Sequence, residues 1–144
     1  MTRINLIKPD DWHLHLRSGE AMKSVVGMSA AQMGRAIIMP NLTPPVKSVR
    51  QAQAYRKEIM KALPVKTDFS PLMTVYLTDN TSPKEIVAAA AAPEVYAAKL
   101  YPAGATTNSD NGVTNITNIY PALEAMQKEV VPLLVHGEVT DPEV

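Results

Sequence analysis

The apolar residues of this chain gather in short runs that alternate with longer segments of helical spacing. Five runs predict extended strands, at residues 4–16, 35–39, 68–77, 95–101 and 132–138. The segments between them predict helices, at residues 20–33, 47–63, 82–92 and the second half of 115–129. In the second helix the apolar positions recur at helical spacing, at Val49, Ala52, Tyr55, Ile59 and Leu63. The chain therefore predicts an alternation of five strands and four helices.

Two of the predicted helices begin at recognisable capping residues. Ser82, Pro83 and Glu85 combine a capping serine, a proline at the first helical position and a glutamate three residues after the cap. Ser18 is in place to cap the helix at 20–33. Prolines also fall at the edges of many segments, and Pro40 after the second strand is one example. Their positions support the predicted boundaries of the strands and helices.

The alternation of strands and helices indicates the fold class. It implies parallel strands joined by right-handed crossovers, and the nearly continuous apolar runs indicate a sheet covered on both faces. Two α/β architectures fit, an open doubly wound sheet and part of a (β/α)8 TIM barrel. The first strand lacks the glycine-rich loop of dinucleotide folds, and polar residues fall at the carboxyl ends of strands, where barrel enzymes place their sites. No linker or repeat is visible, so we expect one domain over residues 1–144.

The composition narrows the class of protein. Basic and acidic residues balance at 14 each, so the basic excess of a nucleic-acid-binding surface is absent. No apolar run approaches the roughly 18 residues of a membrane span, and the N-terminus lacks the apolar centre of a signal peptide. The chain has no cysteine, which excludes disulfides and leaves nitrogen and oxygen atoms as metal ligands. We expect a soluble, cytoplasmic protein that binds neither nucleic acid nor membranes.

Three histidines and one lysine lie at the ends of predicted strands. His13 and His15 are two residues apart in DDWHLHLR, so both point to one side of the first strand and can share a metal ion. Lys99 lies inside the apolar run VYAAKLY, and His136 lies in LLVHGE. The alternatives are an exposed or packed histidine pair, a lysine whose amine reaches water, and a hydrogen-bonded core histidine. We expect all four residues to lie at the same rim of the sheet, and this shared position favours a metal site over the alternatives.

Arg17, Asn41 and one long loop can bind an organic ligand beside that rim. Arg17 can hold a carboxylate through two hydrogen bonds, and the alternative is a salt bridge to Asp10 or Asp11. Asn41 follows the second strand and can donate and accept hydrogen bonds, or can be an ordinary turn residue. The polar loop at 102–115 is long enough for a lid over a site, or is a plain mobile surface loop.

Five segments of the chain, taken together, match a known family. They are DDWHLHLR, RAIIMPNLTPPV, FSPLMTVYLTD, AAKLYPAGATTNSDNGVT and PLLVHGEVT. In this order they resemble the homodimeric bacterial and fungal dihydroorotases of the amidohydrolase superfamily. The resemblance implies an α/β fold of the (β/α)8 TIM-barrel type, of which this chain holds about the first five strands and four helices. It also implies the reversible conversion of dihydroorotate and water to N-carbamoyl-aspartate, in pyrimidine biosynthesis.

The resemblance further implies roles for single residues. His13, His15, Lys99 and His136 match ligands of two Zn2+ ions, and Lys99 matches a lysine that CO2 converts to a metal-bridging carbamate. Substrate contacts are implied for His15, Arg17, Asn41, Thr106, Thr107 and His136. The two threonines match the tip of a loop that closes over substrate. Metal pairs of this kind acidify a bound water and polarise a carbonyl, and the full-length family implies a homodimer.

The chain departs from the family pattern after its fifth strand. A (β/α)8 barrel typically takes about 250 residues, and the family's further zinc-ligand histidine and general-base aspartate belong to later strands. Asp141 follows the fifth strand and does not match that aspartate. We expect an N-terminal portion that is inactive alone and exposes an apolar edge on its fifth strand. The alternatives are another cyclic amidohydrolase, such as a hydantoinase or allantoinase, and a non-catalytic truncated paralogue.

Overall fold

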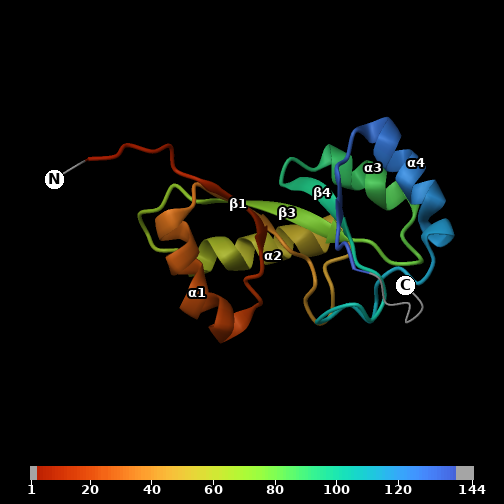
Figure 1. Ribbon diagram of the computed structural model, residues 1–144, viewed down its shortest axis with the longest axis horizontal. Helices are drawn as coiled ribbons and strands as arrows, with labels where there is room; N and C mark the ends of the chain where they lie inside the picture. The colour runs from red at the N-terminus through yellow and green to blue at the C-terminus, as the bar shows by residue number, and fades with distance from the viewer. Residues whose placement is uncertain (1–2, 139–144) are drawn as a thin grey trace.

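The computed structural model of the protein describes residues 3–138, which form one five-stranded parallel sheet with helical crossovers (Figure 1). The strands lie side by side in chain order, β1 (Asp10–Leu14), β2 (Arg35–Ile38), β3 (Ser70–Tyr76), β4 (Val95–Leu100) and β5 (Leu133–Val135). The connecting helices are α1 (Gly19–Gln32), α2 (Val49–Ala62), α3 (Pro83–Ala91) and α4 (Tyr120–Glu129), with a short 3-10 helix η1 (Ile116–Ile119) before the last. The predicted alternation and the α/β class are therefore confirmed.

The outer strands are shorter than the sequence predicts. Residues 4–9 are not part of a strand, and Ile4, Leu6 and Ile7 are exposed. The pairing of β1 with β2 begins only at Asp10, opposite Arg35, so the residues before it have no neighbouring strand to bind. An apolar run forms a strand only where a partner satisfies its backbone groups, and the same limit reduces β5 to three residues.

The helix caps follow the sequence prediction at one helix and depart from it at another. At α3 the Ser82 side chain accepts from the Glu85 backbone N–H, and the Glu85 carboxylate accepts from the Ser82 backbone N–H, a complete capping box. At α1 Ser18 occupies the predicted N-cap position, but its side chain makes no capping hydrogen bond. Instead the Gly19 N–H donates to the Glu58 carboxylate of α2 at 2.8 Å. The start of α1 is therefore held by a neighbouring helix.

The core lies on both faces of the sheet. One cluster packs α1 and α2 against β1–β3, and a second packs α3 and α4 against β3 and β4. Figure 1 shows these two helix pairs at opposite ends of the molecule. Ile37, Met39 and Leu72 alternate with the residues of those clusters and form a third on the other sheet face. Lys99 also faces this side, because it pairs with Leu134, which packs against the third cluster.

The two edge strands differ in how they are protected. On β1 the Asp10 carboxylate binds the Arg35 guanidinium of β2, with Nε to Oδ1 at 3.1 Å. On β5 Leu133 and Val135 are exposed, so the expected apolar edge is present. Within residues 3–138 no helix is long and apolar enough to cross a membrane.

Candidate active site at the carboxyl ends of the strands

His13 and His15 converge at the end of β1. Their Nε2 atoms lie 3.1 Å apart, and their ring centroids are 5.0 Å apart. Two imidazole nitrogens that bind one tetrahedral zinc at about 2.0–2.1 Å are separated by about 3.3 Å. The pair therefore has the spacing of two ligands on one metal ion.

The lysine of the apolar run is buried at the same rim. Lys99 is 2% exposed, so its side chain as a whole is buried. Its Nζ lies 5.0 Å from the centroid of the Tyr101 ring, and no hydrogen bond or ion pair involves it within residues 3–138. Burial lowers the pKa of Lys99 because the charged ammonium is poorly solvated there. A lysine with this environment has an amine available for chemistry.

The three side chains act on one another electrostatically. Burial and then the charge of Lys99 lower the pKa of His13. Burial and then the charge of His13 lower the pKa of His15. Both shifts favour the neutral imidazole, which is the form that binds metals.

His136 lies close to this group but is held by another residue. It directly follows β5, and its ring lies 5.7 Å from the Tyr101 ring between centroids. Its Nε2 is 2.6 Å from a carboxylate oxygen of Glu138, a partner that the sequence reasoning missed although H-G-E places the two residues two apart. In the part of the chain that the structure describes, no three His, Cys, Asp or Glu side chains gather as a metal site. Asp141 lies outside the described residues.

Asn41 is buried between β2 and the loop at 102–115. It is 2% exposed, unlike an ordinary surface turn residue. Its Nδ2 donates to the Thr107 carbonyl at 2.9 Å, and Asn108 Nδ2 donates back to the Asn41 carbonyl at 3.1 Å. Its Oδ1 has no partner among the described residues. In Figure 1 the cyan loop lies beside the orange segment that follows β2.

The loop at 102–115 also has its own internal structure. Ser109 is fully buried, and its Oγ donates to the Thr106 carbonyl at 2.6 Å and accepts from the Thr106 N–H at 2.8 Å. At the far end Thr114 donates through its N–H and its hydroxyl to the Asp79 carboxylate, at 2.9 and 2.7 Å. These bonds hold the loop across the ends of β3 and β4. The side chains of Thr106 and Thr107 remain half-buried and exposed, respectively.

Arg17 is placed by its backbone. Its φ of 61° lies in the left-handed region, and the Tyr55 hydroxyl of α2 donates to its carbonyl at 2.6 Å. The alternative of a salt bridge to Asp10 is wrong, because the Asp10 carboxylate binds Arg35. The charge of Arg17 acts instead on two ring side chains. It lowers the pKa of His15 in the same direction as the larger effects of burial and His13, and it lowers the pKa of Tyr101 against the larger effect of burial.

Two tyrosines that the sequence reasoning missed complete the rim. Tyr76 ends β3 and stacks on Tyr101 at 5.3 Å between ring centroids. Burial raises the pKa of Tyr76 to about 12 and raises that of Tyr101 further. The Tyr101 hydroxyl has no hydrogen-bond partner among the described residues.

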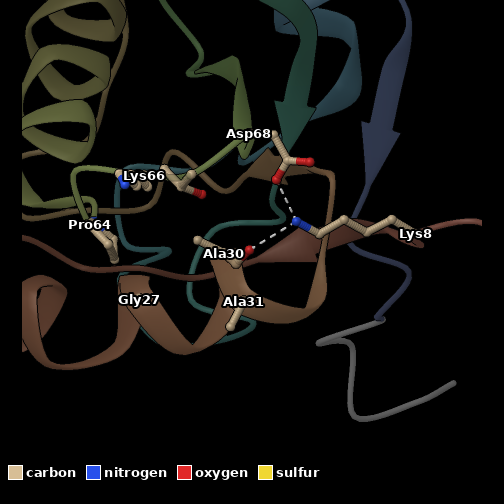
Figure 2. Close-up of a pocket in the computed structure, with 8 residues that line it drawn as sticks. Lys8, Gly27, Ala30, Ala31, Pro64, Lys66 and Asp68 are labelled. Atoms are coloured by element: carbon tan, nitrogen blue, oxygen red, sulfur yellow. Dashed lines mark hydrogen bonds and ion pairs between the residues drawn. The ribbon is translucent and has the colours of Figure 1, made fainter.

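A hollow of about 570 Å³ lies at the other end of the strands, against the end of α1 (Figure 2). There Lys8 Nζ donates to Asp68 at 2.6 Å and to the Ala30 carbonyl at 3.2 Å. Lys8 lowers the pKa of the Asp68 carboxyl by this bond. The amino-terminal end of a parallel barrel serves stability and not catalysis, so this hollow is separate from the candidate site.

Five parallel strands with helical crossovers, and candidate site residues at their carboxyl ends, match the N-terminal part of a (β/α) barrel. The structure is similar to dihydroorotase from Campylobacter jejuni, with a TM-score of 0.85 and 41% identity over 93% of this chain and 39% of that one. It is also similar to dihydroorotase from Saccharomyces cerevisiae in complex with 5-fluoroorotic acid, with a TM-score of 0.83 and 35% identity over 92% of this chain and 37% of that one.

The sequence relatives agree with this class. The chain is 62% identical to dihydroorotase from Cupriavidus taiwanensis over 142 residues, which are 99% of this chain and 41% of that protein. It is 56% identical to dihydroorotase from Nitrosococcus oceani over 144 residues. Over nearly its whole length the chain is therefore similar to dihydroorotases. It spans about two-fifths of the length of these relatives, 41% and 42%, and corresponds to their N-terminal part. No family model matches the chain.

Proposed function

We propose that this chain supplies the N-terminal part of a zinc-dependent dihydroorotase active site. The observation that carries the proposal is the convergence of the His13 and His15 Nε2 atoms, 3.1 Å apart, on the same rim as the buried Lys99. The reaction is the reversible hydrolysis of dihydroorotate. Water adds to the ring amide carbonyl, the C–N bond breaks, and the ring nitrogen takes a proton to give N-carbamoyl-aspartate.

The residues of the rim would supply part of the ligand set of two zinc ions. His13 and His15 would hold the first through their Nε2 atoms, and His136 would contribute to the second after turning away from Glu138. A carbamate on Lys99 would join the two. When bound, such a pair supplies an acidified water and polarises a carbonyl. The neutral state of both imidazoles supports this assignment, since only the unprotonated nitrogen binds a metal.

Carboxylation of Lys99 requires only CO2 and a neutral amine. The amine lone pair attacks the carbon of CO2, one C–O π pair moves onto oxygen, and a proton leaves the nitrogen to solvent. The product is an N-carboxylate with one negative charge and two ligand oxygens. Burial that disfavours the ammonium form supports this chemistry at Lys99.

Arg17 and Asn41 would bind the substrate carboxylate and ring. Arg17 presents an exposed guanidinium beside His15, and the Asn41 amide lies behind the loop that carries Thr106 and Thr107. The yeast relative was solved with 5-fluoroorotic acid, a pyrimidine carboxylic acid. That complex supports a ligand of this class for the present rim.

A zinc titration of the 144-residue chain tests the metal site directly. With bicarbonate supplied, we expect zinc to bind stoichiometrically, and His13→Ala and His15→Ala to weaken binding by roughly tenfold to a hundredfold. Glu20→Gln is the control, because the contacts described for Glu20 are with Lys23 and Ser24 of its own helix. Equal zinc affinity in the histidine variants and the control would contradict the proposal.

Turnover tests the reaction. The chain is mixed with a second chain that carries the remaining residues of the Cupriavidus taiwanensis relative, and dihydroorotate, hydantoin and allantoin are offered with zinc. We expect hydrolysis of dihydroorotate alone. Preference for hydantoin or allantoin would assign a different cyclic amidohydrolase, and zinc binding without any turnover would favour the non-catalytic alternative.

A further inference from the structure

The Tyr101 hydroxyl is a buried polar group without a partner. Tyr101 is 1% exposed, and its hydroxyl makes no hydrogen bond to any described residue. Leaving a buried hydroxyl unpaired destabilises a fold, and native structures retain few such groups. A group of this kind at a candidate active site indicates a partner that is not part of the protein chain.

Tyr101 is also fixed in position. Tyr76 stacks on its ring at 5.3 Å with an angle of 23° between the planes, and His136 packs against it at 5.7 Å. The main chain of Tyr101 is also tightly packed against the main chain of Gly112. A Cβ on Gly112 would lie only 2.4 Å from the Tyr101 carbonyl oxygen. The hydroxyl therefore cannot turn away to find another acceptor without moving its neighbours.

Among the described residues, Lys99 places its amine over the face of this ring, and Arg17 acts on Tyr101 through its charge. Tyr101 follows Lys99 by two positions, so both side chains leave the same side of the strand. The Lys99 Nζ lies 5.0 Å from the ring centroid. An ammonium at this place has no lone pair to accept the hydroxyl proton, whereas the oxygens of an anion built on that nitrogen can accept it.

We propose that the Tyr101 hydroxyl donates a hydrogen bond to the carbamate formed on Lys99 and holds that carbamate in place. The inference rests on the proposed function, which introduces the carbamate. A carbamate has two oxygens with two lone pairs each, more than two metal ions use. A buried anion is stable only when donors satisfy the remaining sites. Tyr101 is then a positioning residue that acts through Lys99.

The test measures the carbamate itself. The zinc-loaded chain is titrated with 13C-bicarbonate, and the carbamate carbon is followed by 13C NMR, with Lys99→Arg used to identify its signal. We expect Tyr101→Phe to raise the bicarbonate concentration at half-maximal signal by about tenfold or more, the effect of one hydrogen bond to a charged group. Tyr76→Phe is the matched control, since it keeps the stacked pair, and we expect less than about a twofold change.

The outcomes separate the two proposals. No carbamate signal in the unsubstituted chain would overturn the carboxylation of Lys99 and the present inference with it. A normal signal in the unsubstituted chain and an unchanged bicarbonate requirement in Tyr101→Phe would overturn the inference alone. Equal shifts in Tyr101→Phe and Tyr76→Phe would also overturn it, because the effect would then come from the aromatic pair.

Thermal unfolding of the metal-free chain gives a second, independent measurement. Removing an unpartnered hydroxyl relieves a desolvation penalty, so we expect Tyr101→Phe to keep or raise the unfolding midpoint. A fall of several degrees would mean that the hydroxyl is bonded within the fold, and would overturn the inference.

Discussion

At the carboxyl end of the sheet, Lys99 on β4 and the histidine pair on β1 have opposite surroundings. Strand β4 lies between β3 and β5 and is paired on both sides, and Lys99 is 2% exposed. Strand β1 is an edge, its register with β2 shifts between Asp11 and Leu14, and both histidines are exposed. The sheet therefore presents one candidate site residue fixed within the core and two at an accessible edge.

This difference follows from strand pairing. A strand with two neighbours has its backbone satisfied and its side chains packed on both faces, so a polar group on it is held rigidly and poorly solvated. An edge strand leaves its side chains in water, and their positions depend on a few tethers. Substitutions in the centre should therefore change stability, whereas substitutions at the edge should change binding with little effect on stability.

The largest expected effect compares a central and an edge aliphatic residue. Ile38 on β2 is fully buried, and Ile38→Ala removes packed methyl groups and leaves a cavity, which should lower the free energy of unfolding by about 3 kcal/mol. Val135 on β5 is 56% exposed, and Val135→Ala should change the free energy of unfolding by less than about 0.5 kcal/mol. Urea unfolding measures the free energy of unfolding of both variants. Equal losses in the two would contradict the expected difference between central and edge strands.

The next effect concerns the loop that crosses the ends of β3 and β4. A methyl group on Gly112 would lie 2.4 Å from the Tyr101 carbonyl oxygen and 2.8 Å from that of Ser109. Because both atoms are backbone, the loop must shift, and we expect Gly112→Ala to cost about 2 kcal/mol in urea unfolding.

Gly104 in the same loop is the control for this substitution. It has a φ of 75° and open space around its Cβ position, so Gly104→Ala should cost only the left-handed backbone strain, about 1 kcal/mol. A larger loss at Gly104 than at Gly112 would mean that backbone conformation, and not close packing, holds this loop.

The sequence predicts the central part of this molecule better than its edges. The capping box at Ser82, the helical spacing around Tyr55 and the burial of the strands are local patterns, and the structure confirms them. The strand expected at residues 4–9 is wrong, because strand formation depends on a partner that the local pattern does not specify.

The candidate site shows the same division. The pairing of His13 with His15 follows from their spacing, and the structure confirms it. The pairing of His136 with Glu138, and the unpartnered hydroxyl of Tyr101, depend on tertiary contacts. An aromatic residue that ends an apolar run is most often part of the core, so the sequence gives no reason to assign Tyr101 to the site.

A smaller effect concerns the hydrogen bond that holds the end of the edge strand β1. The Tyr55 hydroxyl donates to the Arg17 carbonyl and links the end of β1 to α2. Tyr55→Phe removes this bond and should lower the free energy of unfolding by about 1 kcal/mol, with faster amide exchange in the segment after β1. Tyr96→Phe, at a tyrosine that is 49% exposed, should change neither quantity. Unchanged exchange in Tyr55→Phe would show that Arg17 is held by other contacts.

The smallest effect depends on pH. It concerns the hydrogen bonds between Asp79, in the loop after β3, and Thr114, in the loop at 102–115. The Thr114 hydroxyl, and then its backbone N–H, lower the pKa of the Asp79 carboxyl by donating to it. The pKa of Asp79 in the folded chain lies below the ordinary value of about 3.9. At a pH between these two pKa values, the unfolded chain therefore binds the proton more readily than the folded chain does. The stabilisation is therefore fully present above the ordinary value and is lost as the pH falls through the folded one.

Asp79→Asn should accordingly lower the thermal midpoint slightly at neutral pH, and the difference from the unsubstituted chain should vanish in acid below the folded pKa of Asp79. Asp110→Asn, at an exposed aspartate of the loop at 102–115, is the control and should show no such dependence. A deficit in Asp79→Asn that persists in acid would mean that the amide perturbs the loop by its shape. The carboxylate charge would then contribute nothing to holding the loop over the centre of the sheet.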